Sequence, residues 1–343
     1  MLDEVRQVLG NEEAWVVGGA VRDELMGRVL VDLDIACREP QQAAHAYQGR
    51  AGGAVFPLSE RHGAWRVAFR DGRTVDFTPL PAEGIEADLA TRDFTINAIA
   101  RTLAADRDEV DPFGGRADIE AHRLRAVSET VFEDDPLRLL RAVRFEQLGF
   151  RLDDHAEGLV RRHADLVTRP AGERILGELA QLNPASFRRL DELGLLEPLG
   201  GSLEKLDRVE TRGAGPLVLI AAFGESLLRL PISNELARYA RTLLRAELPP
   251  DLSARSIHRF RRATEPWALD ALTFLGARVD AAAAVEEARR VDPAEPLVRG
   301  DELGLPPGPE IGRLLDRIAE ERAAGTISTR EEALELARRE AQR

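Results

Sequence analysis

The period of the hydrophobic pattern changes once along this sequence, near residue 125. Up to about residue 120, short runs rich in β-branched and aromatic residues alternate with glycine-containing turns, which is typical of strands. Beyond about residue 130, apolar residues recur at helical spacing almost to residue 340. The sequence therefore predicts an α+β chain, in which a mixed α/β head with a β-sheet is followed by an all-helical remainder.

The expected elements follow from this pattern and from the positions of proline and glycine. In the head we expect strands at residues 14–17, 30–36, 54–56, 64–69 and 74–78, and helices at 21–26 and 93–101. In the remainder we expect helices at residues 136–147, 159–167, 171–181, 186–193, 235–245, 266–275, 281–289, 310–323 and 330–339. The breaks between these helices follow no fixed period, so we expect several small bundles rather than a solenoid.

The charge of the chain excludes one class of partner and directs attention to local surfaces. The sequence has 47 Lys and Arg against 60 Asp and Glu, a formal net charge of −13, so it is not a generally basic nucleic-acid coat. Residues 229–262 nevertheless hold eight arginines against three acidic residues. This segment is either a solvated helical face or a phosphate-contacting surface. Its candidate contacts are Arg238, Arg241, Arg245, Arg259 and Arg262.

Cysteine content and hydropathy limit the location of the protein. Cys37 is the only cysteine, which excludes an intrachain disulfide and a metal site built from cysteines. No apolar run approaches the roughly twenty residues that span a bilayer, and the first ten residues lack the apolar core of a signal peptide. We therefore expect a cytoplasmic protein with no membrane partner, and nothing in the sequence indicates a protein partner.

A glycine pair and an aspartate pair carry the clearest chemical signal. Asp32 and Asp34 are two apart on a predicted strand, so their carboxylates share one face and repel each other unless a cation lies between them. Hard oxygen ligands suit Mg²⁺, which usually binds one or two carboxylates together with substrate phosphates. Gly18 and Gly19 allow the backbone to approach a phosphate closely, and Arg22 adds a charged fork. Together these residues indicate a metal–triphosphate site.

Further motifs follow in order along the chain. They are Arg92-Asp93-Phe94-Thr95-Ile96-Asn97-Ala98, Asp111-Pro112-Phe113-Gly114-Gly115 with Asp118, Asp134-Asp135-Pro136-Leu137-Arg138 with Arg141 and Arg144, and Glu173-Arg174 with Glu178 and Leu179. The ordered set resembles the class II tRNA nucleotidyltransferases and bacterial poly(A) polymerases of the polymerase-β-like superfamily. The resemblance covers residues 14 to about 180. It implies a nucleotidyltransferase head at residues 1–122, a base-recognising helical neck at 123–200, and an RNA-binding helical body and tail at 201–343.

The resemblance also implies roles for individual residues. Asp32 and Asp34 would hold two Mg²⁺ ions, with Mn²⁺ as a substitute, and Gly18, Gly19 and Arg22 would hold the triphosphate. Asp76 is either a third metal-binding carboxylate or an outward-facing strand residue. Arg92 would contact phosphate, and Asp93 or Asn97 the ribose. Without the resemblance, the pattern indicates a helix cap at Asp93 with Arg92 solvated.

The segment that begins at Asp135 would recognise the base of the incoming nucleotide. Arg138, Arg141 and Arg144 are spaced by three, so on a helix they form one polar stripe, which is either solvated or functional. Cytosine and adenine each present an amine beside a ring acceptor, which Asp135 and Arg138 can match with one acceptor and one donor. Guanine and uracil present a carbonyl where those bases present the amine, so Asp135 would reject them.

The sequence departs from the family pattern at three places. Asp134 stands where the family usually has Glu, and Thr91 stands where it commonly has a second arginine. Full CCA-adding members carry a flexible loop before the Arg-Asp-Phe-Thr motif, whereas here residues 78–85 connect almost directly to it. This short connection favours a CC-adding subtype that uses CTP on the 3′ end of tRNA. The alternatives are CCA addition, A addition from ATP, poly(A) synthesis, and a non-catalytic RNA-binding protein.

Overall fold

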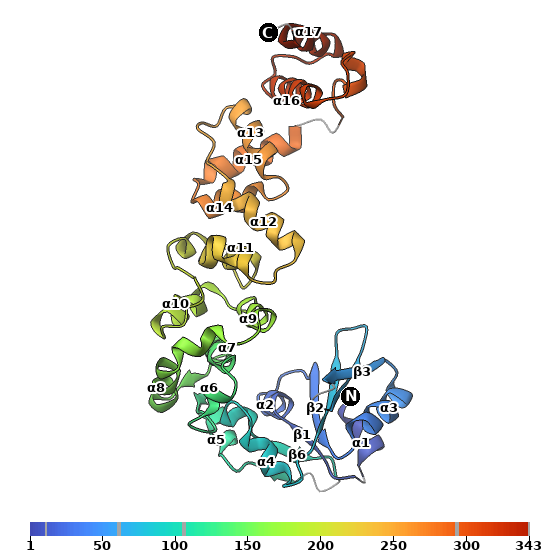
Figure 1. Ribbon diagram of the computed structural model, residues 1–343, viewed down its shortest axis with the longest axis vertical. Helices are drawn as coiled ribbons and strands as arrows, with labels where there is room; N and C mark the ends of the chain where they lie inside the picture. Colours follow the sequence, from blue (N-terminus) through green and yellow to red (C-terminus); the bar gives the residue numbers. More distant parts are fainter. Residues whose placement is uncertain (11, 60–62, 105–107, 292–294, 342–343) are drawn as a thin grey trace. The chain divides into compact units, whose positions relative to one another are not determined.

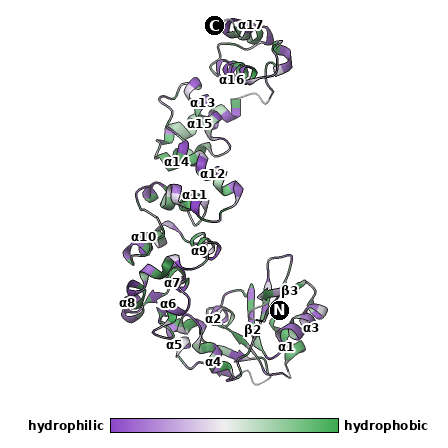
Figure 2. Ribbon diagram, in the orientation of Figure 1, coloured by the Kyte–Doolittle hydropathy of each residue, from purple (hydrophilic) through white to green (hydrophobic). Residues whose placement is uncertain are grey.

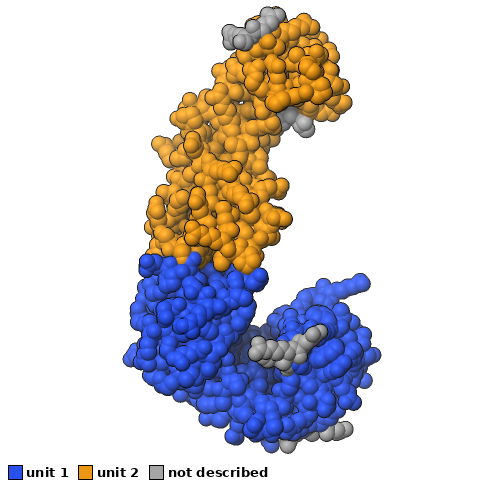
Figure 3. All heavy atoms as spheres, in the orientation of Figure 1, with its two compact units in different colours: residues 1–199 blue, residues 200–343 orange. Residues whose placement is uncertain are grey.

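The computed structural model describes residues 1–343 except 11, 60–62, 105–107, 292–294 and 342–343. The chain divides into two compact units, residues 1–199 and residues 200–343, which are coloured separately in Figure 3. Unit 1 contains the β-sheet together with a first set of helices, and the regular elements among the described residues of unit 2 are helices and 3-10 turns. The predicted α+β class, in which a mixed α/β head is followed by a mainly helical chain, is confirmed (Figure 1). Two short strands, at residues 123–124 and 151–152, interrupt the segment that was expected to be all-helical.

Unit 1 is organised around a seven-stranded sheet with the strand order β3-β4-β5-β2-β1-β6-β7. The strands are β1 (Ala14–Val17), β2 (Asp32–Cys37), β3 (Ala54–Ser59), β4 (Ala64–Ala68), β5 (Thr74–Pro79), β6 (Ala100–Thr102) and β7 (Glu109–Val110). Strands β2 and β5 are parallel, and the other neighbouring pairs are antiparallel. A separate parallel pair is formed by β8 (Arg123–Leu124) and β9 (Arg151–Leu152).

Helices cover the sheet and continue beyond it in unit 1. They are α1 (Leu2–Leu9), α2 (Gly19–Leu25), α3 (Pro40–Ala51), α4 (Ile85–Ala90), α5 (Gly115–Glu120), α6 (Val131–Asp134), α7 (Arg138–Gln147), α8 (Asp154–Arg162), α9 (Gly172–Leu179) and α10 (Pro184–Glu192), with 3-10 turns η1 (Thr95–Asn97) and η2 (Ala164–Thr168). Helix α3 packs on β4 and β5, where the buried Tyr47 ring meets Phe69 and Phe77. Alternation along the strands leaves the other side of β2 and β5 free for polar groups.

The helix expected at residues 93–101 is wrong. The chain forms only the turn η1 there and then enters β6, which pairs with β1 through Val17 and Ala100. The carboxylate of Asp93 accepts hydrogen bonds from the Phe94 backbone N–H and the Asn97 side chain, both at 2.8 Å. These local hydrogen bonds stabilise the turn instead of a helix. The segment is buried on all sides, which makes its hydrophobic pattern uninformative about the period.

Unit 2 consists of α11 (Pro216–Phe223), α12 (Asn234–Arg245), α13 (Ala254–Thr264), α14 (Ala268–Leu275), α15 (Val279–Val291), α16 (Pro309–Ala323) and α17 (Arg330–Ala341), with 3-10 turns η3 (Leu206–Val209), η4 (Gly224–Arg229) and η5 (Gly300–Leu303). Most of these helices carry hydrophobic and hydrophilic residues together, as Figure 2 shows for the whole chain. Helix α11 was not predicted, because all but its first residue are buried and its sequence is apolar on every side. Helix α13 was not predicted either, because polar residues dominate its sequence.

Among the described residues, no single helix combines the length and apolar character needed to cross a membrane. The segments Pro216–Arg229 and Asn234–Arg245 meet that test only when taken together, and the chain bends by 114° between them. The cytoplasmic location stays a prediction.

Candidate active site

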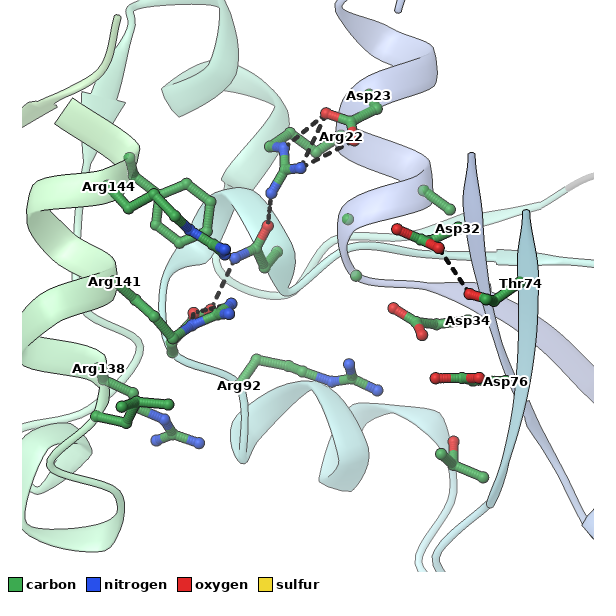
Figure 4. A pocket seen from close by; sticks show the side chains of 18 of the residues that line it. Arg22, Asp23, Asp32, Asp34, Thr74, Asp76, Arg92, Arg138, Arg141 and Arg144 are labelled. Atoms are coloured by element: carbon green, nitrogen blue, oxygen red, sulfur yellow. Dashed lines mark hydrogen bonds and ion pairs between the residues drawn. The ribbon is translucent and has the colours of Figure 1, made fainter. Parts of the chain in front are cut away.

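An open cavity of about 840 Å³ lies within unit 1, between the polar side of the sheet and helices α7 and α9. Figure 3 shows the hollow in this unit, and Figure 4 shows the side chains that line it. All thirteen residues predicted for the metal and the nucleotide line this one cavity: Gly18, Gly19, Arg22, Asp32, Asp34, Asp76, Arg92, Asp93, Asn97, Asp135, Arg138, Arg141 and Arg144. The fold therefore brings together motifs that are up to 126 positions apart in the sequence.

Three aspartates project from neighbouring strands on the sheet side of the cavity. Asp32 and Asp34 lie two apart on β2, and Asp34 is directly opposite Asp76 on the parallel strand β5. Burial raises the pKa of Asp34, and repulsion from Asp76 and Asp32 raises it further, against the lowering effect of Arg92. Asp76 lies inside the cavity wall with 9% of its surface exposed, so the outward-facing alternative for this residue is wrong.

The aspartates suit a hard cation that is completed by other ligands. Thr74 donates a 2.6 Å hydrogen bond to Asp32, whereas no described side chain donates to the partly buried carboxylate of Asp34. Within the described ranges, no group of three acidic, His or Cys residues is arranged to hold a metal ion by itself. A divalent ion on Asp32 and Asp34 would therefore need water and phosphate oxygens to complete its coordination, as Mg²⁺ usually does.

The glycine turn leaves space beside these carboxylates. Gly18 has a φ of 68°, and a Cβ atom there would lie 3.2 Å from Nη1 of Arg92 and 3.6 Å from Oδ2 of Asp34. Any side chain at this position would strain the backbone and crowd the guanidinium of Arg92. Arg92 itself extends toward Asp34 and Asp76 (Figure 4), and its guanidinium is held by Asp88 at 2.7 Å. Because Gly18 has no side chain, the carboxylates and the Arg92 guanidinium are both accessible beside this turn.

Arg22 and Asn97 connect α2 to the buried turn η1. Nη1 of Arg22 donates to Oδ1 of Asn97 at 2.6 Å, and its other nitrogens bind Asp23 at 2.9–3.0 Å (Figure 4). Nδ2 of Asn97 donates in turn to Asp93 at 2.8 Å. The guanidinium of Arg22 also lies 5.3 Å from the centre of the Phe145 ring on α7. Most of its donors are therefore already engaged within the protein.

Asp93 links the head to helix α7. Nε of Arg141 donates to its carboxylate at 2.8 Å, beside the bonds from Asn97 and Phe94. Burial would raise the pKa of Asp93, but the charge of Arg141 and these hydrogen bonds outweigh it and lower the pKa. Asp93 is consequently a buried, ionised group that ties two motifs together.

The residues predicted to recognise the base are also held by neighbours. Asp135 accepts a hydrogen bond from Nη2 of Arg174 at 2.7 Å, and Arg138 donates to the carbonyl oxygen of Thr91 at 2.5 Å. On the same helix, Arg144 lies 3.2 Å from Glu178, a carboxyl whose pKa is raised by burial. Asp135 and Arg138 thus stand at the start of α7 in defined orientations, facing the cavity.

Comparison with known proteins identifies the family. The poly A polymerase head domain family matches residues 14–84 and 68–125. The A-adding tRNA nucleotidyltransferase of Deinococcus radiodurans is 34% identical, over 93% of this chain and 94% of that protein. The chain belongs to the class II tRNA nucleotidyltransferase family.

Other members of the family are similar over different lengths. The CC-adding tRNA nucleotidyltransferase of Geobacter sulfurreducens is 43% identical over 53% of this chain, which spans only 41% of that relative. The crystal structure of the Bacillus stearothermophilus CCA-adding enzyme in complex with CTP is 27% identical and has a TM-score of 0.77, with 99% of this chain and 97% of that chain covered. The similarity to a solved member of the tRNA nucleotidyltransferase family therefore extends through both units.

The cavity of this family member contains residues that were not predicted as site residues. They are Arg66, which pairs with Asp76, Arg174, which pairs with Asp135, and Asp88, which pairs with Arg92. Arg174 belongs to the Glu173-Arg174 family motif, so the sequence contained a signal for it. Arg66 belongs to none of the motifs, and its position opposite Asp76 follows only from the pairing register of β4 and β5.

The arginines predicted to form one basic surface in unit 2 lie in two different settings. Arg238, Arg241 and Arg245 share one face of α12 and line a pocket of about 430 Å³. On α13, Arg259 binds Glu320 at 2.6 Å, and Arg262 pairs with Asp316. Both acids belong to α16, so the charges of Arg259 and Arg262 are compensated within the protein.

Proposed function

We propose that this chain transfers CMP or AMP from CTP or ATP to the 3′ end of tRNA, without a nucleic-acid template. One observation carries the proposal: the Asp32–Asp34 pair and the Asp135–Arg138 pair line one cavity, and Figure 4 shows Arg138 across it from Asp32 and Asp34. The first pair suits a metal-bound triphosphate and the second suits a base edge. A protein that selects the base with its own side chains must bind the triphosphate and the base of one nucleotide at the same time, and this cavity has polar groups for both.

Each group in the cavity has a proposed task in the transfer. Two Mg²⁺ ions, or Mn²⁺, bound by Asp32 and Asp34 would supply activation of the RNA 3′-hydroxyl and neutralise charge at the α-phosphate. Arg92 would bind phosphate oxygens beside the bare backbone of Gly18 and Gly19, and Arg22 would orient Asn97 toward the ribose. Asp76 is a candidate third ligand only where Arg66 releases it.

Base selection would follow from the start of α7. The Asp135 carboxylate accepts from the amine of cytosine or adenine, and Arg138 donates to the adjacent ring nitrogen. A carbonyl in place of that amine would face the carboxylate, which costs binding free energy. Arg141 is engaged with Asp93 and Arg144 with Glu178, so their proposed tasks are to hold α7 against the head and against α9.

The favoured subtype is CC addition. Only residues 80–84 separate β5 from α4, so the stretch before the Arg92 motif has no room for a long flexible loop. A addition is the second candidate, because one relative that matches over nearly the whole chain is named an A-adding enzyme. The two subtypes make opposite demands on the substrate, since CC addition begins on tRNA that lacks CCA and A addition begins on tRNA that ends in CC.

The test offers labelled CTP or ATP with tRNA ending before CCA, after C, after CC, and after CCA. CC addition predicts CMP incorporation that stops at CC, and A addition predicts a single AMP on tRNA ending in CC. Addition through to CCA, or repeated AMP addition to any RNA, would replace the subtype with CCA addition or poly(A) synthesis. No incorporation with Mg²⁺ and either nucleotide would refute the proposed function.

We further propose that residues 1–122 form the catalytic head, residues 123–200 the neck, and residues 201–343 the RNA-binding body and tail. For the RNA surface we propose the α12 face of Arg238, Arg241 and Arg245. Among the described residues, no acidic side chain pairs with Arg241 or Arg245. Such arginines are free to contact phosphates, whereas the α13 arginines would first have to leave α16.

Charge reversal tests this surface. The double variant Arg241→Glu with Arg245→Glu should raise the Kd for tRNA by about tenfold or more at 0.1 M salt and should flatten its salt dependence. The matched control is Arg290→Glu on α15, an exposed arginine whose only described partner is Glu287. Equal Kd values for the double variant and the control would place the RNA elsewhere.

A further inference from the structure

Arg66 occupies a position next to the acidic cluster that no family motif explains. It lies on β4 directly opposite Asp76 on β5, and Asp76 lies directly opposite Asp34 on β2. Directly paired residues of adjacent strands share one face of a sheet, so the three side chains form a row across three strands. All three line the cavity. The guanidinium of Arg66 thus lies at one end of this row, and Asp34, a proposed metal ligand, lies at the other.

The contact between Arg66 and Asp76 uses the whole carboxylate. Nε of Arg66 donates to Oδ1 and Nη2 donates to Oδ2, both at 2.6 Å. This is the two-pronged geometry that suits a guanidinium and that a lysine cannot reproduce. The Asp76 side chain is 12% exposed and that of Arg66 33%, so the pair is largely shielded from water. Asp32 and Asp34 have no such partner, since Asp32 accepts only from Thr74 among the described residues.

We propose that Arg66 is a positioning residue that holds the Asp76 carboxylate in an ion pair. This pair keeps Asp76 from binding a divalent ion, so the ion site is restricted to Asp32 and Asp34. The pair contributes no net charge, whereas a free Asp76 would add both a negative charge and an oxygen ligand to the cluster. The free protein then binds divalent ions weakly, and tight binding requires the phosphate oxygens of the incoming nucleotide. The proposal rests on the proposed function only in assigning the metal to Asp32 and Asp34.

Binding of Mn²⁺ to the full chain without nucleotide tests the proposal. Arg66→Gln should tighten Mn²⁺ binding by about tenfold or more, because it exposes a charged carboxylate beside the site. The double variant Arg66→Gln with Asp76→Asn should return to the wild-type affinity, since it removes that carboxylate again. Free Mn²⁺ is counted by electron paramagnetic resonance, and the fold of each variant is compared by circular dichroism.

Two further variants keep the test decisive. Arg73→Gln removes an arginine from the same β4–β5 hairpin, where it pairs with the exposed Asp71 outside the cavity, and should leave Mn²⁺ affinity unchanged. Arg66→Lys keeps the charge but loses the fork, and should give an affinity between those of wild type and Arg66→Gln. If Arg66→Gln does not fold, wild-type affinity in a folded Arg66→Lys overturns the proposal.

The outcomes separate this inference from the proposed function. Unchanged Mn²⁺ affinity in Arg66→Gln, with wild-type protein that still transfers CMP or AMP, would make the pair purely structural and leave the function standing. Tighter binding in Arg66→Gln that persists in the double variant would assign the effect to Arg66 alone and also overturn the proposal. A wild-type chain that transfers no nucleotide would refute the function, whatever the Mn²⁺ affinities.

Discussion

Asp93 offers the sharpest test of how the cavity is held together. Its carboxylate accepts from Arg141, Asn97 and the Phe94 backbone, and only 5% of the residue is exposed. Asp93→Asn keeps the volume but removes the charge that Arg141 faces. Breaking a buried pair on one side costs about 3–5 kcal/mol. Because the side chain of Arg141 is 29% exposed and can recover some hydration, we expect the lower end, about 3 kcal/mol.

The loss is measurable in unit 1 by itself. Trp15 and Trp65 lie in unit 1 and Trp267 in unit 2, so in a Trp267→Phe background fluorescence reports the unfolding of unit 1. At 2–4 °C per kcal/mol for a unit of this size, a loss of about 3 kcal/mol lowers Tm by about 6–12 °C. The control Asp165→Asn changes an exposed aspartate of the same unit and should shift stability by no more than about 0.5 kcal/mol.

The pH dependence gives a second reading of the same prediction. The pKa of Asp93 is lower in the folded chain than its ordinary value near 3.9. Its stabilisation is therefore complete above that ordinary value and disappears as the pH falls through the folded pKa. The difference between wild type and Asp93→Asn should be constant from pH 7 to about 5 and should shrink below about 4. A loss under 1 kcal/mol at pH 7, or a difference that grows below pH 4, would refute the reasoning.

Three further predictions concern separate parts of unit 1. Asp32→Ala should abolish nucleotide transfer while tRNA binding in a filter assay stays within twofold of wild type, and lost binding would instead indicate a structural role. Arg138→Ala should reduce discrimination of CTP and ATP against UTP and GTP, which competition between labelled nucleotides measures; unchanged selectivity would remove this residue from base recognition. Burial raises the pKa of the Cys37 thiol to about 12, so at pH 8 a thiol reagent should react only as fast as unit 1 unfolds, and rapid labelling of the native chain would contradict this burial.

Local patterns were sufficient for the parts of the site that lie on single elements. Alternation along one strand correctly predicts that Asp32 and Asp34 share a face, and both line the cavity. Spacing by three correctly predicts that Arg138, Arg141 and Arg144 lie along one side of a helix, and all three line the same cavity. Their roles in catalysis and base recognition remain predictions.

Contacts between elements that are far apart in the sequence could not be deduced from local patterns. The contact of Arg174 with Asp135 spans 39 positions, and that of Arg141 with Asp93 spans 48. The error at residues 93–101 has a similar origin, because tertiary burial and the pairing of β6 with β1 override the local pattern. Patterns in a sequence report which face of an element is apolar, but they carry no information about which polar groups meet across the fold.

The two arginine groups of unit 2 show how this limits an argument from charge. Counted along the chain, residues 229–262 are strongly basic, because their acidic partners lie more than fifty positions later on α16. In the folded unit, Arg255 binds Glu321, which is 6% exposed, and Arg259 and Arg262 bind other α16 acids. These pairs join α13 to α16 and leave the excess positive charge on α12. An RNA surface in a chain of net charge −13 therefore has to be sought among arginines that the fold leaves uncompensated, which is the reason for choosing α12.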